Sequence, residues 1–184
     1  MKRFASALLI ALFCVALSAA QNPPAPPKPA PELKNLDYFT GTWHLSGDMK
    51  ASPFGPAGKF TGTEHNEWME GGFFLVSRSE ESMPAGKAKG LAIFGYDNDG
   101  KAYTYQAFNS MGEAEHARGA LEGNIWTWTN EQKMGDKLMR GRFTVKTISP
   151  TAYEFKFEMA PEGGDWSTVM EGKATKAPAA TVKK

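Results

Sequence analysis

Apolar and polar residues alternate along most of this chain from about residue 42 onward. In the run Tyr153–Met159, aromatic and Met side chains at odd positions alternate with charged side chains at even positions. Successive side chains of a strand point to opposite faces, so this pattern predicts a strand with one apolar face. Glycine, proline, asparagine and aspartate separate the runs. We predict strands at Thr42–Lys50, Lys59–Met69, Phe73–Glu81, Lys89–Tyr96, Lys101–Asn109, Glu113–Leu121, Asn124–Asn130, Lys137–Ile148, Ala152–Met159 and Trp166–Thr175.

One turn between these runs is especially clear. The apolar run Leu91–Phe94 leads to Asp97-Asn-Asp-Gly100, and alternation resumes at Tyr103 and Tyr105. Aspartate and asparagine tolerate left-handed backbone angles, and glycine adopts them without steric cost. The segment is therefore predicted to be a β-hairpin.

A single helical pattern precedes the strands. Leu33, Leu36 and Phe39 recur at three-residue spacing within Glu32–Phe39 and predict a short N-terminal helix. No helical pattern separates the strands, which favours an antiparallel up-and-down sheet whose closure removes exposed edges. We predict an all-β fold, an antiparallel barrel of about ten strands, with a β-sandwich as the alternative.

The predicted strands also indicate what the barrel holds. Glu64 and Asn66 share one face, His65 and Glu67 share the other, so polar groups occur on both faces of that strand. A barrel of about ten strands is wider than the eight-stranded size that side chains fill. We therefore expect an internal cavity for a small, partly apolar ligand.

The first residues are typical of an export signal. Lys2 and Arg3 precede the apolar run Ala5–Leu17, and small residues up to Ala20 provide a cleavage site. The run is too short to span a membrane, so we expect a secreted or periplasmic protein without a transmembrane segment. The only cysteine, Cys14, would leave with the signal, and the mature chain would have no disulfide.

Composition divides the remaining chain. We predict a signal peptide at 1–20, a proline-rich linker at 21–31, the barrel at 32–175 and a flexible tail at 176–184.

Lysine and arginine number 21 against 20 aspartate and glutamate residues, and they form no basic block. Near-zero charge argues against a nucleic-acid partner. The oligomeric state is left open.

Several motifs resemble a known family. Gly41-Thr-Trp43 after a short helix resembles the Gly-x-Trp signature of lipocalin-like (calycin) barrels, where the tryptophan plugs one end. Residues 33–175 resemble the bacterial domain-of-unknown-function family 1579 (DUF1579). The resemblance rests on Glu70-Gly-Gly-Phe-Phe-Leu75, Gly95-Tyr-Asp-Asn98, Tyr103 and Asn109-Ser-Met-Gly112, which follow in order. It implies a calycin-like barrel with Trp43 as the plug, and no established activity.

Cofactor and metal sites find little support. Among lipocalin-like barrels of similar strand number, those that bind haem have their axial histidine late in the chain, and no histidine follows His116 here. Each strand offers at most two metal ligands on one face. Two sets offer ligand types, namely Glu64, His65 and Glu67, and Glu113, Glu115 and His116, but neither has three side chains on one face, so we expect no cofactor and no metal.

Three hypotheses for function follow. The first is a barrel that binds a small hydrophobic or amphipathic molecule without chemistry, with no catalytic residues. The second is a barrel enzyme that uses a metal or a buried carboxylate such as Glu64, with Tyr105 or Arg142. The third is an envelope interaction protein with a solidly packed barrel. The candidate ligand-binding residues, polar or aromatic, are Glu64, Asn66, Trp68, Tyr105, His116, Trp126, Arg142, Tyr153 and Phe155.

Overall fold

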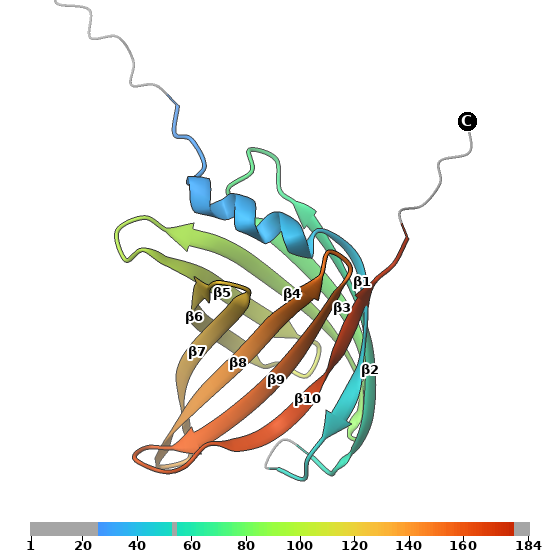
Figure 1. Cartoon of the computed structure of the whole chain (residues 1–184). Helices are drawn as coiled ribbons and strands as arrows, with labels where there is room; N and C mark the ends of the chain where they lie inside the picture. Colours follow the sequence, from blue (N-terminus) through green and yellow to red (C-terminus); the bar gives the residue numbers. More distant parts are fainter. Residues whose placement is uncertain (1–25, 53–54, 179–184) are drawn as a thin grey trace, which may run out of the picture.

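A computed structural model describes residues 26–52 and 55–178. Its strands form one closed barrel in which each pairs antiparallel with its neighbours along the chain, and β1 pairs with β10 (Figure 1). The predicted antiparallel barrel is confirmed, and the sandwich alternative is wrong. The strands are β1 (Gly41–Met49), β2 (Gly58–Trp68), β3 (Leu75–Met83), β4 (Gly86–Asp97), β5 (Ala102–Asn109), β6 (Ala114–Glu122), β7 (Ile125–Met134), β8 (Lys137–Ser149), β9 (Ala152–Pro161) and β10 (Ser167–Lys176).

The strand ends follow the predicted turns closely. The Asp97–Gly100 turn joins β4 and β5, and the Asp97 carboxylate accepts the backbone N–H of Asp99 and of Gly100. The largest difference is in β7, which continues to Met134 rather than ending at Asn130. Its last residues are mostly polar and give no apolar alternation, yet their backbone still pairs with β8.

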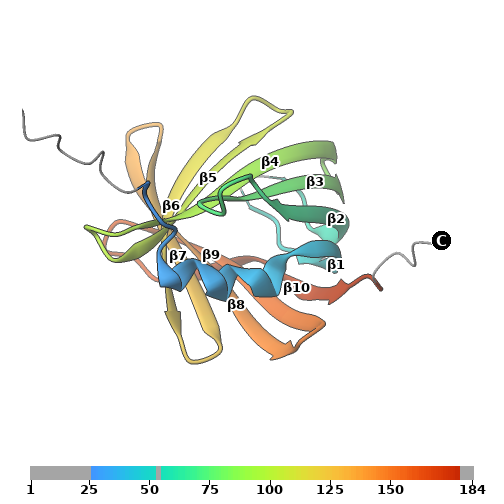
Figure 2. The same ribbon diagram turned by 90° about the horizontal axis from the view of Figure 1, so that it is seen from above.

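The predicted short N-terminal helix at Glu32–Phe39 is not supported as an ordinary helix. Residues Pro31–Phe39 form a 3-10 helix, η1, rather than an α-helix. A 3-10 helix has three residues per turn, so side chains at i and i+3 lie in one row. Leu33 and Leu36 therefore face the barrel together and are buried, at 4% and 0% exposure. η1 lies across one end of the barrel (Figure 2).

Aromatic side chains fill the barrel beneath η1. Trp43 is completely buried, and its indole N–H donates to the Phe39 carbonyl at the end of η1, 2.8 Å away. Its ring lies 4.9 Å from that of Tyr153, and the Phe39 ring lies 5.4 Å from that of Trp126. This end of the barrel is thus packed solid.

The two strands that close the barrel approach each other closely at a glycine pair. Gly47 of β1 is opposite Gly172 of β10. A Cβ on Gly172 would meet the Ser46 carbonyl oxygen, and it would lie 2.8 Å from the Phe155 ring. The missing side chains leave room for the inward-facing rings of Phe60 and Phe155, whose centroids are 5.8 Å apart.

Candidate ligand-binding cavity

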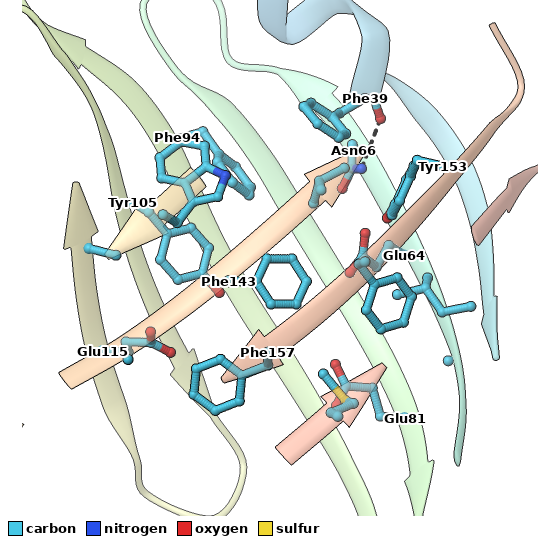
Figure 3. Close-up of a pocket in the computed structure, with 18 of the residues that line it drawn as sticks. Phe39, Glu64, Asn66, Glu81, Phe94, Tyr105, Glu115, Phe143, Tyr153 and Phe157 are labelled. Atoms are coloured by element: carbon cyan, nitrogen blue, oxygen red, sulfur yellow. Dashed lines mark hydrogen bonds between the residues drawn. The ribbon is translucent and has the colours of Figure 1, made fainter. Parts of the chain in front are cut away.

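A cavity of about 320 Å³ occupies the barrel interior below the packed end (Figure 3). Its size falls at the lower end of the range for small-molecule pockets, roughly 300–1,000 Å³. Each of the ten strands contributes at least one side chain other than glycine or alanine to its lining. The lining residues are Phe39, Leu45, Phe60, Gly62, Glu64, Asn66, Glu81, Phe94, Tyr105, Glu115, Ala117, Trp128, Asn130, Gly141, Phe143, Val145, Tyr153, Phe155, Phe157 and Met170.

The wall is largely aromatic. Phe143 and Phe155, on β8 and β9, stack at a centroid distance of 5.7 Å. On the opposite side, the Phe94 ring lies 5.0 Å from Tyr105 and 5.5 Å from Trp128. Two aromatic surfaces therefore face the same space, and either can pack against the apolar part of a ligand.

The cavity is closed at the η1 end and opens at the other. Trp43 and Leu36 exclude solvent at the closed end, where both are fully buried. Glu115 is close to the start of β6, at the end of the barrel away from η1, and it lines the cavity while remaining exposed to solvent. Glu115 therefore marks the solvent-facing end of the cavity, which we call its mouth.

Glu64 projects from β2 into the cavity, with Asn66 next to it on the same face. Burial raises the pKa of Glu64 to about 7, the negative charge of Glu81 adds to this effect, and a hydrogen bond with Asn66 opposes it. The Asn66 amide N–H donates to the Phe39 carbonyl at 2.8 Å, so this amide links the cavity to η1. Its Oδ1 is buried and has no hydrogen-bond partner.

Two further carboxyl groups lie nearer the mouth. Glu81 comes from β3 and Glu115 from β6, and burial raises the pKa of each. The Asn130 amide donates to the Glu115 carboxylate at 3.0 Å. Figure 3 shows Glu64, Glu81 and Glu115 at separate places on the wall.

Tyr105 lies within the influence of all three carboxyl groups. Burial raises the pKa of its phenol, and the charges of Glu115, Glu64 and Glu81 raise it further. None of the described residues that line the cavity is lysine, arginine or histidine. The lining of the interior therefore holds three acidic groups and no basic one, and His116, on the outer face of β6, offsets the charge of Glu115 alone.

The structure brings together five of the predicted ligand-binding residues. Glu64, Asn66, Tyr105, Tyr153 and Phe155 all line the cavity. The interior is not filled, so the hypothesis of a solidly packed barrel does not hold.

The four other candidates, Trp68, His116, Trp126 and Arg142, do not line the cavity. Trp126 is buried in the packed end against Phe39, and Trp68 donates its indole N–H to Asp37 of η1 at 2.7 Å. His116 is exposed on the outer face of β6, since its neighbour Ala117 faces the cavity.

Arg142, the fourth, is on the outer face of β8. Its guanidinium donates to the Glu158 carboxylate at 2.8 Å and lies 4.3 Å from the centre of the Trp166 ring. Burial opposes ionisation of Glu158, but hydrogen bonds from Lys156 and Arg142 outweigh it and lower the pKa of that carboxyl. Arg142 therefore has a structural partner on the outside of the barrel and cannot reach Glu64.

Sequence reasoning missed Glu81 and Glu115 as cavity residues. Glu115 shares a face with Ala117, Gly119 and Leu121, an apolar and small-residue set that marks the inner side of β6. That signal was present in the sequence and favours Glu115 over His116. Glu81 has a weaker signal, because Ser77 and Ser79 interrupt the apolar face of β3 that Leu75 and Met83 mark at its ends.

The residues weighed as metal ligands are divided between the two faces of the barrel. Glu64 faces inward, whereas His65 contacts Thr42 at 3.1 Å on the outside. His44 likewise contacts Thr63 on the outer face. Within the part of the chain that the structure describes, no group of three or more His, Cys, Asp or Glu residues is arranged to hold a metal ion.

The fold and cavity define a lipocalin-like barrel, closed by its first and last strands and plugged at one end. A model of the family "Protein of unknown function (DUF1579)" matches residues 28–176, and the chain belongs to this family. The resemblance predicted from the sequence motifs is thereby confirmed. No curated protein matches the chain.

Solved structures share the fold. Rv2717c from M. tuberculosis superposes with a TM-score of 0.55 at 13% identity, covering 82% of this chain and 100% of that chain. The S-type phycobiliprotein lyase CPES from Guillardia theta gives a TM-score of 0.52 at 8% identity, covering 79% of this chain and 92% of that chain. At these identities the likeness concerns the fold. Among the described residues, no helix is long and apolar enough to cross a bilayer.

Proposed function

We propose that this protein binds a small, partly apolar molecule inside its barrel. The observation that carries the proposal is the cavity of about 320 Å³, which has aromatic walls and three carboxyl groups. Apolar burial supplies affinity at roughly 25 cal/mol per Å², and a few polar groups set the orientation of the ligand. The similarly folded protein from Guillardia theta is named an S-type phycobiliprotein lyase, and this similarity in fold supports a small-molecule role for the barrel of this chain.

Filling the cavity tests this function. Ala117 lines the cavity, whereas Ala120 is exposed on the outer face of the same strand. Ala117→Phe introduces a ring into the cavity, and Ala120→Phe is the matched control. We expect native mass spectrometry of protein purified from the cells that make it to detect a bound small molecule in the wild type and in the Ala120 variant. The Ala117 variant should lack it.

Far-ultraviolet circular dichroism of both variants checks that the barrel remains folded. The proposal fails if the wild-type protein carries no small molecule and takes up none from an extract of the same cells. It also fails if the folded Ala117 variant retains the molecule as well as the control does.

Glu64 favours a second candidate function, general acid-base catalysis. A carboxyl whose pKa is about 7 can accept and return a proton near neutral pH. The molecule recovered from the cavity can be incubated with the wild type, with Glu64→Gln and with Glu67→Gln, which changes an outward carboxylate on the same strand. A change in its covalent structure that requires Glu64 alone supports catalysis, and recovery of the unchanged molecule from all three contradicts it.

We also propose that the protein is exported. The proposal rests on the sequence pattern of residues 1–20, which lie outside the described residues. Cell fractionation followed by N-terminal sequencing tests it. We expect a mature protein outside the cytoplasm that begins at Gln21, and an intact N-terminus in the cytoplasmic fraction would contradict export.

A further inference from the structure

The amide groups of the cavity already use their donors within the protein. Asn66 donates to the Phe39 carbonyl, and Asn130 donates to the Glu115 carboxylate. The remaining acceptor of Asn66, Oδ1, is buried without a partner, in a residue that is only 4% exposed. A buried acceptor of this kind is stabilised when a ligand brings an N–H or O–H donor to it.

The orphan acceptor lies next to a carboxyl group. Glu64 and Asn66 are two residues apart on β2, so their side chains enter the cavity from the same face of the strand. Both offer oxygen acceptors to the cavity. When Glu64 is ionised, both side chains offer only acceptors here, and one group with several donors can satisfy the two together.

The charge of the cavity points to the same kind of group. Glu64, Glu81 and Glu115 are its acidic lining residues, and no basic residue among the described lining offsets them. Ionised carboxylates are costly to bury without a positive partner. Tyr105 and Tyr153 are neutral phenols and cannot supply that charge.

The walls suit a cation as well as an apolar body. Aromatic faces attract a positive charge placed over them, and they bury hydrocarbon favourably. Phe143 and Tyr105 lie between Glu64 and Glu115 on the cavity wall (Figure 3), and Phe155 also lines the cavity. A molecule with a charged end and an apolar body therefore matches both the polar and the aromatic parts of the wall.

We propose that the cavity selects a small amphipathic amine, with its ammonium group bound by the Glu64 carboxylate and Asn66 Oδ1 and its apolar body held between the aromatic walls. This inference rests on the proposed ligand-binding function and specifies its ligand class. The ammonium supplies donors to both acceptors and neutralises Glu64. Glu81 and Glu115, nearer the mouth, attract the cation as it enters.

Three probes of similar shape and different charge test the inference: 2-phenylethylamine, 2-phenylethanol and phenylacetate. Isothermal titration calorimetry at about pH 8 keeps the amine protonated and Glu64 ionised. We expect the full-length wild type to bind the amine at least about tenfold more tightly than the alcohol, and phenylacetate most weakly.

Glu64→Gln keeps the size of the side chain and removes its charge. We expect it to weaken amine binding by at least about tenfold and to leave 2-phenylethanol binding unchanged. Glu67→Gln is the matched control, because Glu67 is exposed on the outer face of β2 and pairs with Arg78. This control should bind all three probes as the wild type does.

The outcomes separate this inference from the proposed function. If the alcohol or phenylacetate binds as tightly as the amine, the amine preference is wrong while the cavity still binds ligands. If Glu64→Gln binds the amine unchanged, the assignment of the ammonium to Glu64 is wrong. If none of the three probes binds and no molecule is retained from cells, the proposed function fails and this inference fails with it.

Discussion

Glu64 is a carboxyl group at a place where water can do little to stabilise its charge. Burial and the nearby charge of Glu81 raise its pKa from an ordinary 4.5 to about 7, and only the hydrogen bond with Asn66 opposes them. Tyr105 and Tyr153 also face it, and both are neutral. The folded protein therefore holds a proton on Glu64 more tightly than the unfolded chain does.

This difference links folding stability to pH. Since the folded-state pKa is raised, the stabilisation from Glu64 is fully present below about pH 4.5 and is lost as pH rises through about 7. At 1.36 kcal/mol per unit of pKa, the loss amounts to about 3 kcal/mol. We expect urea unfolding of the wild type to show this decrease in the free energy of unfolding between pH 4.5 and pH 8.

The Glu64→Gln variant should lose the part of that decrease that comes from Glu64, because glutamine does not titrate, and keep the part from Glu81 and Glu115, whose pKa values burial also raises. Glu67→Gln should keep it, since Glu67 is exposed to solvent. Equal pH dependence in the wild type and both variants would show that Glu64 is not the responsible group.

At the scale of elements, η1 is fixed to the barrel by hydrogen bonds that span long stretches of sequence. Asn35 donates to the Tyr103 hydroxyl at 2.8 Å, and Tyr103 donates to the Glu32 carbonyl at 3.0 Å. The Tyr38 hydroxyl donates toward the β8–β9 turn, where the Ala152 carbonyl lies 2.8 Å away. A 3-10 helix of nine residues is longer than usual, and these contacts account for its persistence here.

Leu36 tests how far this packing stabilises the molecule. Its side chain is completely buried between η1 and the barrel, whereas Lys34 of the same helix is exposed. We expect Leu36→Ala to lower the free energy of unfolding by about 2–5 kcal/mol through cavity formation, and Lys34→Ala to change it by less than about 0.5 kcal/mol. Chemical denaturation of both variants gives the values, and a small loss for Leu36→Ala would mean that η1 contributes little to stability.

Strand positions were predictable because side chains in a sheet alternate with a period of two, and the turns contain residues suited to them. The type of η1 was not, since a three-residue spacing over two turns fits an α-helix and a 3-10 helix alike. The position of each inward side chain along the barrel axis was also not predictable from the sequence. Trp126 and Trp128 share a face of β7 and stack with an interplanar angle of 4°, yet only Trp128 lines the cavity. The alternation of apolar and polar residues identifies the side chains that face inward. It does not distinguish those in the packed end from those that line the cavity.

The whole barrel depends on the close approach of its first and last strands. At this seam, a Cβ on Gly172 would meet the Ser46 carbonyl oxygen and lie 2.8 Å from the Phe155 ring. Gly62 is also on the inner face, but a Cβ there would make ordinary contacts of 3.4 Å or more. Gly172 and Gly62 therefore share the inner face and differ in how closely other atoms approach them, so Gly62 is the matched control for Gly172.

We expect Gly172→Ala to lower the free energy of unfolding by about 2 kcal/mol or more, since backbone atoms cannot move aside without opening the seam. Gly62→Ala should cost less than about 1 kcal/mol. Thermal unfolding followed by circular dichroism measures both. Similar losses in the two variants would contradict a special role for the seam.

The packing of Trp43, Leu36 and η1 at one end has a consequence for kinetics. A molecule that binds in the cavity has no exit at the η1 end, where Trp43 and Leu36 are completely buried, so it enters and leaves at the other end. A second molecule cannot push the first through the barrel. Exchange is therefore sequential, and the dissociation rate of a bound ligand stays constant however much competitor is added.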